Sequence, residues 1–147
     1  MKITCEVKVK GNTTEFPIKA LIDTGAEISF LPIEIARHIG AWKTREEMDI
    51  IGVHKDVKKY PLVIAEVFFP SLNLIGGKFR WAMSDVSNEP IIGMDILKPL
   101  GITINSKNGI LSIKNELWEA FKTLTAVGVI MYGAVKILGS LAEEENN

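Results

Sequence analysis

Residues 20–32 read Ala-Leu-Ile-Asp-Thr-Gly-Ala-Glu-Ile-Ser-Phe-Leu-Pro, and the interpretation of the chain starts from this stretch. One apolar run leads into Asp23, Thr24 and Gly25, and a second apolar run follows at once. That order predicts a buried strand, a tight turn around the glycine and a second strand. Asp23 is then a carboxylate between two hydrophobic strands. Because burial opposes its charge, such an acid must be paired, hydrogen-bonded or functional.

A second stretch, residues 90–97, reads Pro-Ile-Ile-Gly-Met-Asp-Ile-Leu. Together the two stretches resemble the Asp-Thr-Gly loop and the late Ile-Ile-Gly element of the retropepsin branch of aspartic proteases. The resemblance covers residues 1–114. It implies a mainly β fold, a small closed retropepsin-like β-barrel with one or two short helices. Our own reading of the strand and turn signals also predicts many short strands in a closed β fold.

The resemblance implies an aspartic endopeptidase, an enzyme that hydrolyses peptide bonds with activated water. Two carboxyl groups sharing one proton can act as base and acid in this reaction. Asp-Thr-Gly occurs only once in the chain. The dyad is therefore expected to be Asp23 and Asp23 of a second copy, across the two-fold axis of a homodimer with a polypeptide substrate. No cofactor or metal is expected, because Asp23 and Glu27 lack a nearby histidine or cysteine set.

Further roles follow from the resemblance alone. Thr24 and Gly25 match positions that support the catalytic loop. Viral members carry Arg-Asn after the second glycine, whereas Met94-Asp95 stands here, so their ion pair to the first loop is absent. Positions that match substrate contacts are Ala26, Glu27, Gly52, Val53, Ile92 and Gly93.

Between the two stretches, a hairpin is expected from about Asp49 to Tyr60. Its place in the chain resembles the flap that covers the retropepsin cleft, although an ordinary surface hairpin has the same pattern. The segment Trp42–Glu47 before it reads as a polar connection, and Gly76-Gly77-Lys78 reads as a hairpin turn. Short helices are predicted at Ile33–Ile39 and Met94–Leu100, each followed by glycine. The predicted strands are 3–9, 15–22, 48–53, 57–69, 79–83, 102–104 and 110–114.

Charge divides the chain. The net charge is −1, and no basic run suggests a nucleic-acid partner. Residues 1–115, the predicted protease domain, carry a net charge of +2, and residues 116–147 carry −3. Composition changes at the same point, which makes residue 115 the predicted domain edge.

Residues 116–142 are predicted to form a hydrophobic helix, followed by an acidic tail at 143–147. A helix over Leu117–Leu141 would be about 38 Å long, enough for a bilayer core of about 30 Å. We therefore expect a single-pass C-terminal membrane anchor. The distribution of basic residues places the protease domain in the cytoplasm.

Two alternatives stay open. An apolar heptad pattern from Leu117 to Ala142 would also suit a helix that pairs in a soluble dimer or packs on its own β-domain. The second alternative is a non-catalytic retropepsin-like module that dimerises or binds peptides at a membrane.

Overall fold

The computed structural model describes residues 2–52, 54–85 and 88–114. The predicted helix 116–142 and the tail lie outside these residues. Within them, no helix has the length and apolar character needed to cross a membrane. In chain order they form β1 (Thr4–Lys10), β2 (Glu15–Ile22), β3 (Phe30–Pro32), α1 (Ile33–Ile39), β4 (Trp42–Ile51), β5 (Val57–Phe69), a 3-10 turn (Pro70–Leu72), β6 (Leu74–Ser84), β7 (Ile91–Ile92), α2 (Met94–Leu97), β8 (Ile102–Ile104) and β9 (Leu111–Ile113).

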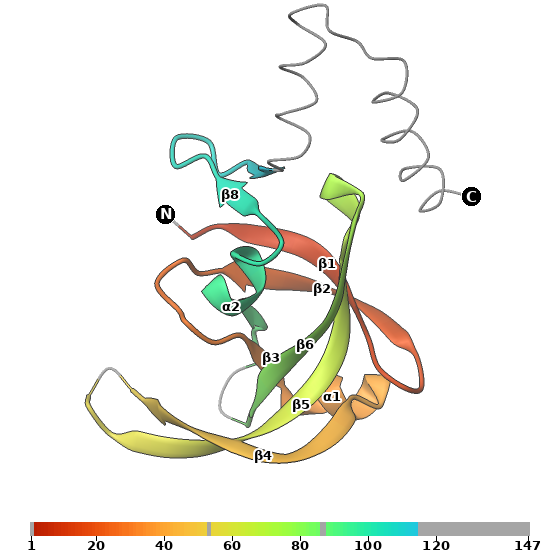
Figure 1. Ribbon diagram of the computed structural model, residues 1–147, viewed down its shortest axis with the longest axis vertical. Helices are drawn as coiled ribbons and strands as arrows, with labels where there is room; N and C mark the ends of the chain where they lie inside the picture. Colours follow the sequence, from red (N-terminus) through yellow and green to blue (C-terminus); the bar gives the residue numbers. More distant parts are fainter. Residues whose placement is uncertain (1, 53, 86–87, 115–147) are drawn as a thin grey trace, which may run out of the picture. The chain divides into compact units, whose positions relative to one another are not determined.

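Seven strands form one mixed sheet in the order β1-β2-β7-β3-β6-β5-β4. Strand β1 also pairs with β5, so six of these strands close into a ring and β4 is added outside it (Figure 1). Two pairings are parallel, β2 with β7 and β3 with β6. Closure removes most free strand edges. The predicted mainly β, closed fold with short helices is confirmed.

The core lies inside this ring. Alternation in β1 turns Val7 and Val9 inward, where they are almost completely buried. The largest fully buried side chains are Trp81 and Phe69. Trp81 satisfies its indole N–H by donating to the Ala65 carbonyl at 3.3 Å. The ring is thus filled by side chains and supports the loops that emerge from it.

Several predicted elements agree with the structure. Strand β5 has the predicted bounds, and α1 begins and ends at the predicted residues. Gly40 ends that helix in the left-handed conformation, with φ at 67°, which glycine adopts without steric cost. Helix α2 is shorter than predicted and ends at Leu97, and turns continue to Gly101.

The polar connection predicted at Trp42–Glu47 is wrong, because these residues belong to β4, and Trp42, Lys43 and Glu47 pair with β5. Trp42 and Thr44 are half-buried, while Lys43 and Arg45 are exposed. The charges lie on the outer face of an added strand, where water solvates them. The prediction rested on the number of charged residues and so missed that half-buried and exposed residues alternate, which is the period-2 pattern of a strand.

The hairpin turn predicted at Gly76-Gly77-Lys78 is also wrong, because these residues lie inside β6. The register of β5 and β6 shifts beside them, and Gly77 has φ at 85°. A bulge uses the same positive φ as a turn, so glycine alone does not distinguish the two. The chain reverses earlier, at the Pro70–Leu72 turn and Asn73.

Candidate active site

The loop that carries Asp23 joins β2 to β3. The Asp23 N–H donates to the Ile92 carbonyl at 2.9 Å, which extends the parallel pairing of β2 and β7. The Ala26 N–H donates to the Asp23 carbonyl at 3.2 Å and closes a tight turn. The predicted turn around Asp-Thr-Gly is therefore present, and the two sequence stretches lie side by side.

The Asp23 side chain is half-buried and held by its own loop. The Gly25 N–H donates to its Oδ1 at 2.9 Å. Among the described residues, no group donates a hydrogen bond to Oδ2. Thr24 and Gly25 are exposed in the single chain. The loop thus fixes one carboxylate oxygen by a backbone donor and leaves this face of the turn open to a partner.

A buried polar cluster fastens this loop to the second stretch. Ser29 is completely buried, and its hydroxyl donates to Asp95 Oδ1 at 2.6 Å. The Ser29 N–H donates to Asp95 Oδ2 at 3.1 Å. The Gly93 N–H in turn donates to the Ser29 hydroxyl oxygen at 2.9 Å. Both oxygens of the Asp95 carboxylate are satisfied from the loop, so α2 is bound to it through a charged acceptor.

A backbone contact closes the same junction. The Met94 N–H donates to the Ala26 carbonyl at 2.8 Å. A Cβ atom at Gly93 would lie 2.6 Å from the Ala26 oxygen and 3.0 Å from the Ile28 oxygen. Gly93 is therefore needed for close approach, since its φ of −102° is open to any residue.

Sequence reasoning missed Ser29 and the role of Asp95. A signal was present, because each is a polar residue inside an otherwise apolar run. A buried polar side chain needs a hydrogen-bond partner, and two such residues in elements expected to be adjacent are natural partners. The departure from viral Arg-Asn at Met94-Asp95 is thus associated with a different link to the same loop.

The predicted substrate-contact residues fall into different environments. Ala26 is half-buried and Glu27 exposed beside Asp23, whereas Gly93 is buried beneath the loop. The Ile92 side chain is completely buried in the core. In the single chain this side chain contributes packing, and the Ile92 carbonyl accepts the Asp23 N–H, while the contact of Ile92 with substrate stays a prediction. The adjacent Ile91 is the half-buried one.

The predicted hairpin forms from β4 and β5 and extends from the ring (Figure 1). Gly52 lies at its tip, where its N–H donates to the Asp56 carbonyl at 2.8 Å. Val53 lies outside the described residues. The flanking side chains of Ile51 and Val57 are 69% and 62% exposed. No hydrogen bond, ion pair or ring contact joins the described tip residues to the Asp23 loop, so these two predicted parts remain separate in the single chain.

Two contacts hold the hairpin farther down. The Tyr60 ring meets Phe30 edge-on at 5.4 Å between centroids. Lys58 Nζ lies 3.0 Å from Asp85 Oδ1. This hydrogen-bonded ion pair raises the pKa of Lys58 and lowers the pKa of Asp85. Both side chains are solvent-exposed, so water and salt weaken the pair.

Metal-binding geometry is absent from the part of the chain that the structure describes. No group of three or more histidine, cysteine, aspartate or glutamate residues converges there.

The Cys5 thiol is half-buried, and burial raises its pKa, which disfavours the reactive thiolate.

No family model and no curated protein matches this sequence. Solved structures do match. EIAV protease, in complex with an inhibitor, is 23% identical with a TM-score of 0.53, and the match covers 71% of this chain and 93% of that one. The retroviral protease-like domain of Ddi1 from Leishmania major is 21% identical with a TM-score of 0.51, over 76% of this chain and 88% of that one. With its closed ring and its Asp-Thr-Gly turn between β2 and β3, the chain has the retropepsin-like aspartic protease fold.

Proposed function

We propose that this protein is an aspartic endopeptidase of the retropepsin type, active as a homodimer. The observation that carries the proposal is the Asp23 carboxylate on a tight, exposed Asp-Thr-Gly turn within a retropepsin-like fold. Each chain supplies one such turn. A complete site then needs Asp23 from two copies, which a two-fold axis beside the exposed Thr24 and Gly25 would provide.

The proposed dyad works through one shared proton. Two carboxyl groups at contact distance cannot both ionise, so one stays protonated and donates to the substrate carbonyl oxygen. The other accepts a proton from water, whose oxygen attacks the carbonyl carbon. Proton transfer to the amide nitrogen then releases the amine when the C–N bond breaks. The rate should follow a bell-shaped pH profile with an acid-side optimum, and both limbs belong to the pair.

The β4–β5 hairpin serves as the flap in this proposal. Its exposed apolar tip residues Ile51 and Val57 would find a partner in bound peptide. Such a cover excludes water from the carbonyl that is attacked and completes the site after the substrate binds. Gly52 and Val53 would then contact the peptide, together with Ala26 and Glu27 of the loop.

The test is the variant Asp23→Asn in the full chain. The amide is nearly isosteric with the carboxylate but cannot act as general base, so cleavage of a peptide library should fall about 10²- to 10⁴-fold. Glu15→Gln is the matched control, since it removes an exposed acid on β2 outside the loop and the hairpin. Undiminished cleavage by Asp23→Asn would overturn the dyad. Failure of both wild type and control to cleave any peptide would favour the non-catalytic binding module.

Mixing the two forms tests the shared site. If each site needs two Asp23 residues, excess Asp23→Asn chains should form mixed dimers and suppress wild-type activity. An inactive chain that leaves wild-type turnover unchanged at every ratio would indicate a site complete within one copy.

We further propose that residues 117–141 anchor the chain in a membrane, with the protease domain in the cytoplasm. The support is the uncharged sequence from Thr123 to Val135, with Trp118 and Lys136 toward its ends. The full chain should float with lipid vesicles. The double variant Val127→Lys/Ile130→Lys should not, because each lysine costs about 3 kcal/mol near the centre of a span. Flotation that survives both charges, or a wild type that stays in the soluble fraction, would contradict the anchor.

A further inference from the structure

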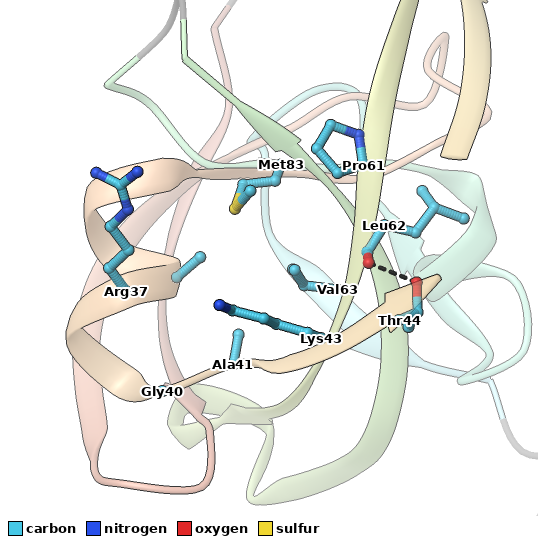
Figure 2. A pocket seen from close by; sticks show the side chains of 10 residues that line it. Arg37, Gly40, Ala41, Lys43, Thr44, Pro61, Leu62, Val63 and Met83 are labelled. Carbon is cyan, nitrogen blue, oxygen red and sulfur yellow. Dashed lines mark hydrogen bonds between the residues drawn. The ribbon is translucent and has the colours of Figure 1, made fainter. Parts of the chain in front are cut away.

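The body of the domain contains a pocket of about 420 Å³ between α1, the start of β4 and the neighbouring parts of β5 and β6. Its apolar lining includes Ala36, Ala41, Leu62, Val63 and Met83. Figure 2 shows the Met83 side chain entering from one side and the Lys43 side chain extending from β4 toward α1. None of the lining residues comes from the Asp23 loop or from residues 90–97. The pocket is therefore separate from the proposed catalytic site.

Backbone geometry builds this hollow. The pairing of β4 with β5 shifts register between Lys43 and Glu47, which interrupts the regular ladder beside the pocket. Thr44 fixes the irregular segment, because its hydroxyl donates to the Leu62 carbonyl at 2.7 Å (Figure 2). The same hydroxyl accepts the Glu46 N–H at 3.0 Å. On the opposite wall, α1 presents the small side chain of Ala36. The space thus exists before any ligand binds.

The charge of the pocket is one-sided. Arg37 and Lys43 are its charged lining residues, and no acidic residue lines it. Neither cation forms an ion pair within residues 2–52, 54–85 and 88–114. Three acids of the described residues pair with other cations: Glu89 with Lys2, Asp85 with Lys58 and Glu46 with Arg80. Both cations therefore line an apolar pocket and have no ion-pair partner among the described residues.

We propose that this pocket binds a small organic carboxylate with an apolar body. The guanidinium and ammonium groups would bind the carboxylate oxygens through charge-assisted hydrogen bonds. The apolar body would displace water from the alanine, valine and methionine surface. The volume lies within the range of small-molecule sites, and an apolar lining with few polar groups is typical of them. This ligand chemistry does not depend on Asp23, so the site stands or falls separately from the proposed protease activity.

Methionine methyl resonances of the full chain provide the readout. The chain is labelled with ¹³C-methyl methionine and titrated with octanoate, and the Met83 signal is assigned with Met83→Leu. The Met83 methyl should shift in a saturable way, while Met94, beside the Asp23 loop, should not. Met131 monitors binding to residues outside the described part. A Met83 signal that stays unchanged, or that moves only in parallel with Met131, would overturn the pocket assignment.

Two comparison ligands define what is recognised. Octan-1-ol has the same apolar chain without the charge, and it should bind more weakly than octanoate. N-acetylleucine carries the carboxylate on a peptide unit. Tighter binding of N-acetylleucine than of octanoate would indicate a peptide carboxyl terminus as the ligand, and the reverse order would indicate a free fatty acid. Equal binding of octan-1-ol and octanoate would overturn the anion site.

Charge variants complete the test. Arg37→Gln and Lys43→Gln should each weaken octanoate binding about twofold to fivefold, the range for solvent-exposed ion pairs. Lys19→Gln is the matched control, because Lys19 is an exposed lysine on β2 outside the pocket. The Met48 and Met94 signals report whether each variant is folded. Unchanged octanoate affinity in the folded double variant Arg37→Gln/Lys43→Gln would refute the proposal.

Discussion

The Asp23 loop and the β4–β5 hairpin are held in opposite ways. The loop is bound to residues 92–95 through a buried serine, both oxygens of Asp95 and two backbone hydrogen bonds. The outer hairpin has exposed apolar residues at its tip, and below the tip it contacts the body through one aromatic pair and one exposed ion pair. Regions with few buried contacts open at lower free energy than the core. The hairpin should therefore open while the loop keeps its geometry, which suits a fixed carboxylate under a movable cover.

The largest expected difference comes from adding one methyl group to a glycine in each region. Gly93→Ala would place its Cβ against backbone oxygens of the Asp23 loop, so the loop or α2 must move. We expect the free energy of unfolding to fall by about 1–3 kcal/mol, as in overpacked cores. Gly52→Ala meets only the side chain of exposed Asp56, which can rotate, so we expect a change within about 0.5 kcal/mol. Urea unfolding of both variants gives the comparison, and equal losses would refute it.

Removal of one hydroxyl should have a somewhat smaller effect. Ser29→Ala deletes the donor to Asp95 and the acceptor of the Gly93 N–H. Groups left unpaired in a buried place cost about 1–3 kcal/mol, partly offset because the Ser29 N–H still donates to Asp95.

The control for this variant is Ser112→Ala. That exposed hydroxyl contacts Thr103 at 3.0 Å, and water replaces the contact. Thermal unfolding should separate the two variants clearly. If Ser29→Ala were as stable as Ser112→Ala, the buried cluster would not be what fastens the loop.

The smallest effect is expected at the hairpin ion pair. Lys58 lowers the pKa of Asp85, so the pair contributes stability above the ordinary Asp pKa and loses it as pH falls through the lowered value. Because the pKa of Lys58 is raised, its contribution is present below the ordinary Lys pKa and disappears as pH rises through the raised one. In Lys58→Gln the pKa of Asp85 should move back up toward its ordinary value, which carboxyl NMR titration measures. Lys59→Gln, one residue along β5, is the control. If Lys58→Gln left the pKa of Asp85 unchanged, the Lys58–Asp85 ion pair would not hold the hairpin to the body.

Sequence patterns were informative where one rule governed the residue. The bounds of β5 follow from a long run between turn signals, and the end of α1 follows from Gly40. Sequence patterns gave wrong predictions where the same residues are typical of two different structures. Charged residues at 43–47 suit a loop or an outer strand, and Gly76-Gly77 suits a turn or a bulge. Only the presence of β5 beside both segments selects the strand.

By itself, the sequence determined that an Asp-Thr-Gly turn would join two apolar strands and that an Ile-Ile-Gly strand would accompany it. Local chain preferences and the need to bury apolar runs are sufficient for that. The tertiary structure decided that Ser29 and Asp95 would be partners, that Ile92 would pack in the core, and that Arg37 and Lys43 would share a pocket. Such pairings depend on which strands become neighbours when the ring closes. Strand order is a property of the whole sheet, so no single segment of sequence determines it.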